Sequence, residues 1–313
     1  MSILVFLEHH DGELQKGSLG VLAKAASLGD AHAVIVGEGV RDLAAVAGNH
    51  GAKTVHVADD ASLAAPFPQP RVDVLAQLAA DYDAVFFANS VLAADIAAGL
   101  AARLDAGLNW DLVDVTGDFV GKRPALQDTV LVDVAWKSTP RLALFRSGSF
   151  DAQESGGSAE VRDVQAQLED FSTRSKMVEQ ARAESSGPSI EDADVNVAGG
   201  RGLGAPENFT LAEELARALG GAVGATRAVV DAGWYPYSAQ IGQTGKTVSP
   251  KLYVALGISG AIQHKVGMQS SNVIVAINKD PNAPIFEFAD LGVVGDLHTI
   301  VPKLTELVQA RKG

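Results

Sequence analysis

The sequence has 313 residues, enough for about two domains of ~150 residues each. It contains 38 acidic and 25 basic residues, and the resulting net charge of −13 argues against binding to nucleic acid or to an anionic membrane surface. The chain has no cysteine, which excludes disulfides, thiolate metal sites, iron–sulfur clusters and a cysteine nucleophile.

The longest segment without a charged residue, 232–245, is shorter than the ~20 apolar residues that a membrane span needs. The apolar run Ile3–Leu7 follows the first two residues directly, without a basic region or a cleavage site. We therefore expect a cytoplasmic protein with no targeting peptide and no direct membrane insertion. Residues 1–189 carry 26 acidic and 15 basic side chains, and residues 190–313 carry 12 and 10, so the second half is the better place for an anionic ligand.

In the first half, short β-rich runs alternate with Ala- and Leu-rich segments of helical spacing. Runs that are apolar on both faces and separated by helices predict a parallel sheet covered on both sides. Segment 159–183 fits either a helix or an extended arm. We expect strands at Ile3–Leu7, Ala33–Gly37, Thr54–Val57, Ala84–Ala88, Leu112–Thr116, Thr129–Val134 and Arg141–Phe145, and helices at Ser18–Leu28, Asp42–Asn49, Val72–Ala80 and Ala93–Leu104.

The same alternation restarts after a linker at Ser185–Ser189, which has small residues and a helix-breaking proline. The pattern predicts an α/β fold of two doubly wound, Rossmann-like parallel-sheet domains, residues 1–188 and 189–313. In the second half we expect strands at Val195–Ala198, Ala228–Val230, Leu252–Leu256 and Val273–Ile277, and helices at Thr210–Leu219 and Asp296–Val308.

Three predicted strands of the second half run into polar or glycine-rich segments: Gly199–Gly202, Gly257–Gly260 and Asn278–Asp280. In open parallel sheets such carboxyl ends line one crevice, where ligands bind. The first of these turns fits a phosphate site with Arg201 as a charged partner, and it fits equally a tight turn with a solvated arginine. The first half lacks a G-x-G-x-x-G motif after its first strand, so we expect no nucleotide there.

Two catalytic motifs fail at a required glycine, which disfavours a hydrolase or a ligase. The segment Gly242–Thr247 resembles a phosphate loop, but Gln240 stands where its first glycine should be. Similarly, Ala261 replaces the second glycine of a nucleophile elbow. No pair of histidines has metal-ligand spacing beside carboxylates, so we expect no metal. His264 is the one histidine beside a glycine-rich turn, and Arg227 can simply pair with Asp231.

Several segments of the second half resemble the alpha subunit of electron transfer flavoprotein, in family order and spacing. They are Gly199–Asn208, Gly224–Asp231, Ile241–Pro250, Leu256–His264 and Ala276–Phe286, and Ala93–Asp105 is the best-matching stretch of the first half. The resemblance implies an electron carrier rather than an enzyme with its own small-molecule substrate. It implies a heterodimer with the family's beta subunit, in which residues 189–313 bind one FAD and residues 1–188 contribute subunit packing.

The resemblance also implies partners. Electrons would come from flavin dehydrogenases, such as the acyl-CoA dehydrogenases of fatty acid beta-oxidation, and would pass to the membrane-bound electron transfer flavoprotein-quinone oxidoreductase. An alternative on the same fold is a non-redox regulatory module that binds an adenine nucleotide. A heterodimer without flavin absorbance would favour that alternative.

By the same resemblance, Arg201 and the turn Ser259–Ile262 hold the pyrophosphate, and Asn278 and Asp296 contact the adenosine side. A flavin reduced by one electron is negatively charged around N1 and the C2 carbonyl, so a cation or strong donor at Arg227 or His264 would raise its one-electron potential. The hydroxyl of Thr244 would form a hydrogen bond with N5 of the flavin. The implied cofactor-binding residues are Arg201, Thr226, Arg227, Ile241, Gly242, Gln243, Thr244, Ser259, Gly260, Ala261, Ile262, Gln263, His264, Asn278, Asp296 and Leu297.

Overall fold

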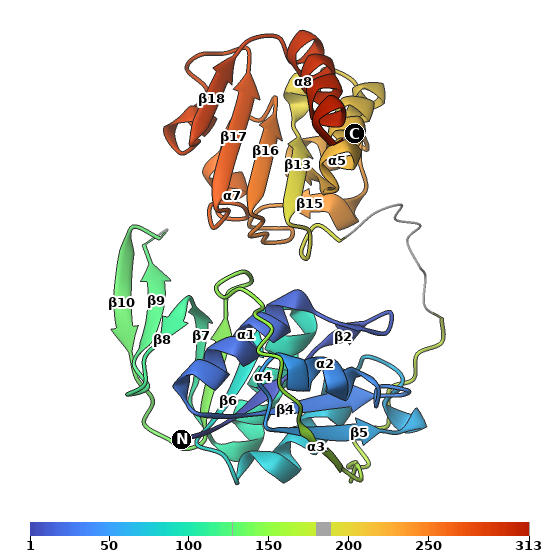
Figure 1. Ribbon diagram of the computed structural model, residues 1–313, viewed down its shortest axis with the longest axis vertical. Helices are drawn as coiled ribbons and strands as arrows, with labels where there is room; N and C mark the ends of the chain where they lie inside the picture. Colours follow the sequence, from blue (N-terminus) through green and yellow to red (C-terminus); the bar gives the residue numbers. More distant parts are fainter. Residues whose placement is uncertain (127, 180–188, 313) are drawn as a thin grey trace. The chain divides into compact units, whose positions relative to one another are not determined.

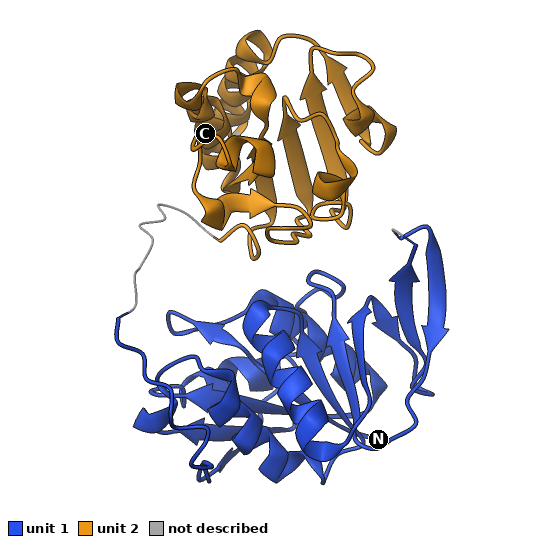
Figure 2. Ribbon diagram, turned by 180° about the vertical axis from the view of Figure 1, so that it is seen from behind, with its two compact units in different colours: residues 1–182 blue, residues 183–313 orange. Residues whose placement is uncertain are grey.

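The structure is a computed structural model that describes residues 1–126, 128–179 and 189–312. The chain forms two compact units, residues 1–182 and 183–313 (Figure 2). The linker expected at Ser185–Ser189 lies, apart from its last residue, outside the described residues. Within the described part, no helix combines the length and the apolar character needed to cross a bilayer.

Unit 1 contains a seven-stranded parallel sheet in the order β12-β5-β4-β1-β6-β11-β7, of which β4, β5, β6 and β7 are labelled in Figure 1. Helices α1 and α2 pack on one face of this sheet and α3 and α4 on the other, so that alternate residues of β1 enter two separate cores. The strands are β1 (Ser2–Phe6), β4 (Asp30–Gly37), β5 (Thr54–Asp59), β6 (Ala84–Ala88), β7 (Leu108–Leu112), β11 (Arg141–Phe145) and β12 (Glu160–Asp163), and the helices are α1 (Lys16–Leu28), α2 (Leu43–Asn49), α3 (Pro68–Ala79) and α4 (Val91–Leu104).

Two small antiparallel sheets complete unit 1. Strands β8 (Asp114–Val115), β9 (Gly121–Ala125) and β10 (Val130–Val134) form one, and β2 (His9–His10) and β3 (Glu13–Leu14) form a hairpin. The single strand predicted at Leu112–Thr116 is wrong, because the chain leaves the large sheet at Leu112 and joins the small one at Asp114. The ambiguous segment 159–183 begins as strand β12 and not as a helix.

Unit 2 is built on a six-stranded parallel sheet in the order β15-β14-β13-β16-β17-β18. Counted along the chain, this is the order 3-2-1-4-5-6 of dinucleotide-binding sheets, and its direction reverses between β13 and β16. The predicted fold class is therefore confirmed. The strands are β13 (Val195–Gly199), β14 (Ala222–Thr226), β15 (Gln240–Ile241), β16 (Leu252–Leu256), β17 (Val273–Asn278) and β18 (Leu291–Val294).

Residues of β16 alternate between the two faces of this sheet. Val254 and Leu256 pack with the long helices α5 (Phe209–Leu219) and α8 (Leu297–Lys312). Tyr253 and Ala255 face the opposite side, where Tyr253 contacts His264 of the short helix α7 (Ile262–Lys265). Segment Ala228–Val230, expected as a strand, instead belongs to a short helix, α6 (Arg227–Val230). Single 3₁₀ turns occupy Ala61–Leu63, Arg201–Leu203, Pro206–Asn208, Tyr237–Ala239 and Pro284–Glu287.

Candidate functional site

The site predicted in unit 2 lies at the carboxyl ends of β13 and β16, where the strand order reverses. In open α/β sheets this point forms a crevice for ligands, because the loops on its two sides lead to opposite faces. The two glycine-rich turns, 199–204 after β13 and 257–260 after β16, both begin there. The third polar segment, which starts at Asn278 where the neighbouring strand β17 ends, joins them through a hydrogen bond from Asn278 to the Ile258 carbonyl. The fold therefore brings together all three polar segments that the sequence singles out.

The two turns contact each other through their backbones. The N–H of Gly202 donates to the carbonyl of Gly257 over 2.9 Å, and the N–H of Gly200 donates to the carbonyl of Leu256 over 2.9 Å. A Cβ atom at Gly202 would lie 2.5 Å from the Cα atom of Gly257. These glycines are required for packing between turns, and the two amides are already used, so neither is aimed at a phosphate.

The side chains on this edge are accessible. Arg201 is exposed and makes no ion pair with the residues that the structure describes. Ser259, Ala261 and Gln263 are exposed as well, and Ile262 leaves 55% of its surface uncovered. An unpaired cation, a hydroxyl and an uncovered apolar side chain at one sheet edge suit a ligand with both phosphate and apolar parts.

The turn after β15 reaches across the sheet edge to α7, although β14 and β13 lie between β15 and β16. The N–H of Gln243 donates to the carbonyl of Gln263 over 2.7 Å. A Cβ atom at Gly242 would come within 2.7 Å of the same carbonyl oxygen. The crossing thus joins two predicted parts of the site, the Ile241–Thr244 turn and the Ile262–His264 helix.

Within this turn Thr244 is held by Gln240, a buried residue. The Nε2 atom of Gln240 donates to the Thr244 carbonyl over 2.9 Å and to its hydroxyl oxygen over 3.1 Å. The hydroxyl of Tyr237 donates to the same carbonyl over 2.9 Å. Because an amide NH₂ only donates, the Thr244 hydroxyl accepts from Gln240 and keeps its own proton for another acceptor.

His264 lies beneath this surface rather than on it. Its Nδ1 atom is 3.0 Å from the Ile241 carbonyl oxygen, and its Nε2 atom is 2.8 Å from the Tyr253 hydroxyl. Burial lowers the pKa of His264 to about 4. The imidazole is therefore neutral near pH 7. Of Arg227 and His264, the two residues expected to supply positive charge, only Arg227 is charged.

Arg227 and Thr226 stand at the end of β14. Thr226 is the last residue of the strand, and Arg227 opens α6, where its Nε atom lies 3.1 Å from Oδ2 of Asp231. The pairing with Asp231 is thus confirmed. Both side chains of this pair are largely exposed, and an exposed pair one helical turn apart contributes only about 0.3–0.5 kcal/mol to stability. The guanidinium can therefore exchange this partner for a ligand at small cost.

The residues expected on the adenosine side already have structural partners. The Nδ2 atom of Asn278 donates to the Ile258 carbonyl over 2.9 Å. Asp296 accepts from the N–H of His298 and from the Thr299 hydroxyl, which caps the first turn of α8. Leu297 is buried against the α5 and α8 core. In this structure Asn278 therefore supports a loop, and Asp296 supports the start of a helix.

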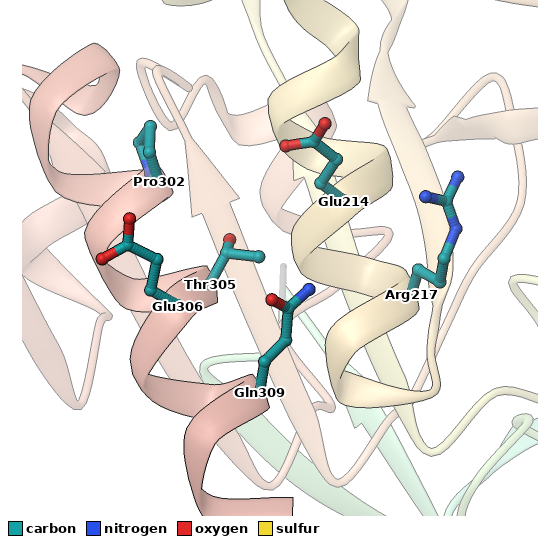
Figure 3. A pocket seen from close by; sticks show the side chains of 6 residues that line it. All are labelled: Glu214, Arg217, Pro302, Thr305, Glu306 and Gln309. Atoms are coloured by element: carbon teal, nitrogen blue, oxygen red, sulfur yellow. The ribbon is translucent and has the colours of Figure 1, made fainter. Parts of the chain in front are cut away.

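A separate hollow of about 370 Å³ lies between α5 and α8 (Figure 3). It is unsuited to an anionic ligand because two carboxylates face it. Helix α5 follows β13 and runs back from the carboxyl edge, so Arg217 in its last turn is remote from the glycine-rich turns. The lining residues are Glu214, Arg217, Pro302, Thr305, Glu306 and Gln309.

In unit 1 the corresponding reversal point, between β1 and β6, is occupied by an acidic side chain. The Ser90 hydroxyl donates to the Glu8 carboxylate. The Oγ atom of Ser90 also accepts a hydrogen bond from the N–H of Ala93 at the start of α4. A carboxylate at this point repels phosphate. Among the described residues, no group of three His, Asp or Glu side chains is arranged to hold a metal ion.

Sequence reasoning missed two residues of the site, Tyr253 and Gln240. Both are buried polar side chains that contact a predicted site residue, and in the sequence Gln240 stands out only because it breaks a phosphate-loop motif. A tyrosine in the middle of a buried strand is a usable signal, because its hydroxyl needs a partner inside the protein.

Comparison with known proteins gives matches along nearly the whole chain. A family model described as the electron transfer flavoprotein FAD-binding domain matches residues 189–269, and one described as the electron transfer flavoprotein domain matches residues 3–169. The electron transfer flavoprotein subunit alpha of Mycobacterium leprae is 42% identical, with 99% of each chain covered. That of Pseudomonas aeruginosa is 39% identical, with 98% of this chain and 100% of the relative covered. Protein FixB of Clostridium saccharobutylicum is 38% identical, with 99% and 96% covered.

Proposed function

Because this chain belongs to the family of electron transfer flavoprotein alpha subunits, we propose that it is the FAD-binding subunit of a heterodimer completed by the family's beta subunit. In this role it accepts electrons from flavin dehydrogenases, such as acyl-CoA dehydrogenases, and passes them to a membrane-bound electron transfer flavoprotein-quinone oxidoreductase. The observation that carries the proposal is the strand order of unit 2, whose reversal point coincides with the family-matched glycine-rich turns.

The residues present at this edge fit FAD. The Gly202–Gly257 contact leaves no room for a Cβ atom, so the two turns pack closely and no side chain projects from either position. Arg201 offers an unpaired guanidinium for a pyrophosphate, and the exposed side chain of Ile262 offers apolar surface for a ring system. When bound, FAD supplies the redox chemistry, and the protein sets its environment.

We carry over the remaining contacts from the resemblance to the family. Arg201 and the turn Ser259–Ile262 hold the pyrophosphate, while Asn278 and Asp296, with Leu297 adjacent, contact the adenosine side. Around the flavin ring stand Thr226, Arg227, Gln243, Thr244 and His264. Ile241, Gly242, Gly260, Ala261 and Gln263 supply backbone to the turns that carry these side chains.

The electrostatic role falls to Arg227. Since His264 is neutral near pH 7, a permanent positive charge near the ring has to come from this guanidinium. Thr244 adds a hydroxyl whose acceptor side is taken by Gln240, so that its proton points to the ligand. No general acid or base is required for electron transfer, and we propose none.

Unit 1 has the complementary role of subunit packing without a nucleotide of its own. The acidic contact between Glu8 and Ser90 at its reversal point supports this proposal, because it removes the anion-attracting character of that position.

The test is co-expression with the cognate beta subunit, followed by the visible spectrum of the purified heterodimer and identification of the released cofactor. We expect one FAD per heterodimer, and its reduction when an acyl-CoA dehydrogenase and its substrate are added. Arg201→Gln should release FAD more readily, because it removes the cation and retains the shape. A colourless heterodimer that binds an adenine nucleotide would overturn the proposal and favour the non-redox regulatory module.

A further inference from the structure

His56 is a buried titratable residue near the edge of the large sheet of unit 1. It lies in β5, the second strand from that edge, and its Cα partner on β4 is Val34 of the core that α3 and α4 cover. The residue is 8% exposed, and its Nε2 atom lies 2.7 Å from the hydroxyl of Tyr82. Between His56 and the solvent at this edge stands only the strand β12.

Strand β12 has few attachments of its own. All four of its residues are exposed, so backbone pairing with β5 holds it in place rather than apolar burial. The N–H of Glu160 donates to the Lys53 carbonyl over 2.9 Å, and Asp163 forms an exposed ion pair with Arg41. A short strand held in this way is among the first parts of a fold to open.

Arg162 of β12 stands directly opposite His56. The two residues are Cα partners in the parallel ladder, and both line a surface hollow of about 560 Å³ beside the end of α3. The guanidinium donates to both carboxylate oxygens of Glu160, over 2.9 and 2.8 Å, which orders it on the strand. A proton on His56 would therefore place a second positive charge across the ladder from the first.

The groups around His56 favour its neutral form. Burial lowers the pKa of His56 most, His32 and Arg162 lower it further, and the two nearest carboxylates raise it by less. Burial raises the pKa of the Tyr82 phenol, so its hydroxyl supplies no negative charge. The titratable and charged side chains that face the imidazole or its hollow are His32, Asp81, Tyr82, Glu160, Arg162 and Asp163.

We propose that His56 is a pH-sensitive latch for β12. The neutral imidazole lets β12 pack beside it, and protonation of the imidazole in mildly acidic solution releases the strand from the sheet. Release makes β5 the edge strand, so water reaches the imidazole, and it removes Arg162 from the opposing position. The inference concerns unit 1 alone and is independent of bound FAD.

Hydrogen–deuterium exchange of the full-length chain tests the latch, with each rate divided by that of an unstructured peptide at the same pH. A solvated histidine has a pKa of about 6.5, so each pH unit below this value favours the released state by up to about tenfold. We expect the protection of β12 to fall by about tenfold between about pH 7 and about pH 5.5, while β1 keeps its protection. Unchanged protection of β12 would show that only the Arg162 side chain moves aside, and would overturn the inference. Equal losses in β1 would mean general unfolding and would overturn it as well.

Two substitutions separate the latch from other effects of acid. His56→Gln retains a hydrogen-bonding partner for Tyr82 but cannot take up a proton, so β12 should keep its protection over the whole pH range. Arg162→Gln removes the opposing charge at an exposed position and should reduce the loss. His50→Gln is the matched control, because this imidazole is equally buried in unit 1 but contacts the Val46 carbonyl, and the native loss should remain.

A native loss of protection in His56→Gln would overturn the inference. If this variant leaves β12 unprotected already near pH 7, the profile of Arg162→Gln decides. A native profile in Arg162→Gln would then show that charge across the ladder does not release the strand.

Discussion

Gly202 and Gly257 meet backbone to backbone at the point where the sheet of unit 2 reverses its strand order. The N–H of Gly202 donates to the Gly257 carbonyl over 2.9 Å, and Gly257 has a φ of +63°. A Cβ atom on Gly257 would lie 2.6 Å from the Cα atom of Gly202. The contact between the two turns therefore depends on the absence of two side chains, and this dependence can be measured.

Gly257→Ala should destabilise the chain by at least about 3 kcal/mol. The left-handed backbone costs an alanine about 1–2 kcal/mol, and the contact with Gly202 forces the two turns apart in addition. Gly233→Ala is the matched control, because Gly233 has a φ of +72° but open space around its Cβ position, so only the backbone cost applies. Urea denaturation of both variants measures the difference. Equal losses would show that the contact between the turns contributes nothing.

Arg227→Gln should lower the one-electron potential of the flavin while leaving the free energy of unfolding nearly unchanged. The exposed pair with Asp231 contributes little, so the free energy of unfolding should change by less than about 0.5 kcal/mol. A charge-assisted hydrogen bond of about 1.5–3 kcal/mol to the reduced flavin corresponds to a fall of roughly 60–130 mV in the one-electron potential.

Asp231→Asn provides the control for this prediction. It breaks the same ion pair but retains the cation, so the potential should stay at the native value or rise. Spectroscopic redox titration of the heterodimer measures both variants. A native potential in Arg227→Gln would remove this residue from the flavin environment.

Gln240 should act on the ligand through Thr244. Gln240→Met keeps the length of the side chain but removes both hydrogen bonds to Thr244, and we expect FAD to bind about tenfold more weakly, the equivalent of about 1.4 kcal/mol. Tyr237→Phe removes another donor to the same carbonyl and leaves the Thr244 hydroxyl in place, so its effect should be smaller. Fluorescence titration with FAD gives the affinities.

A double-mutant cycle with Thr244→Val checks the route of this effect. If Gln240 works by orienting the hydroxyl, the double variant should bind FAD as weakly as Thr244→Val alone. Additive losses would mean that Gln240 supports the turn as a whole.

The sequence predicts buried strands well because their signal is local. Strands β6, β11 and β16 coincide with the predicted ranges Ala84–Ala88, Arg141–Phe145 and Leu252–Leu256, each an apolar run buried on both faces. Strands β14 and β15 carry no such signal, because the residues of Ala222–Thr226 are small and include a glycine, and β15 has only two residues. The β-branched stretch Ala228–Val230 predicts a strand but forms part of a short helix, because the packing of Val229 into the core overrides its local preference.

The candidate site can likewise be predicted from the sequence only in part. Its exposed loops could be predicted because glycine and polar residues follow strands directly, and parallel strands end at one edge. Its supporting contacts could not, because they arise where the chain crosses over the sheet: the Ile241–Thr244 turn reaches α7 across two intervening strands. For the same reason the burial of His264 between Tyr253 and the Ile241 carbonyl has no local signature.

The buried imidazole of His264 should make the stability of unit 2 dependent on pH. Burial lowers its pKa to about 4 in the folded chain, whereas a histidine in the unfolded chain has a pKa of about 6.5. Between these values the unfolded state binds a proton that the folded state does not, so the free energy of unfolding falls as the pH drops from about 6.5 to 4, by roughly 3 kcal/mol in total from this group. Above pH 6.5 both states are neutral here and the contribution is constant.

Urea denaturation at pH 7 and at pH 5 tests this dependence in the native chain and in His264→Gln, whose side chain does not titrate. The variant should lose less stability between the two pH values than the native chain, whatever its absolute stability, because other titrating groups contribute equally to both. His298→Gln removes an exposed imidazole from α8 and should retain the native difference. If His264→Gln loses as much stability as the native chain, the imidazole already carries its proton in the folded state, and burial does not keep it neutral.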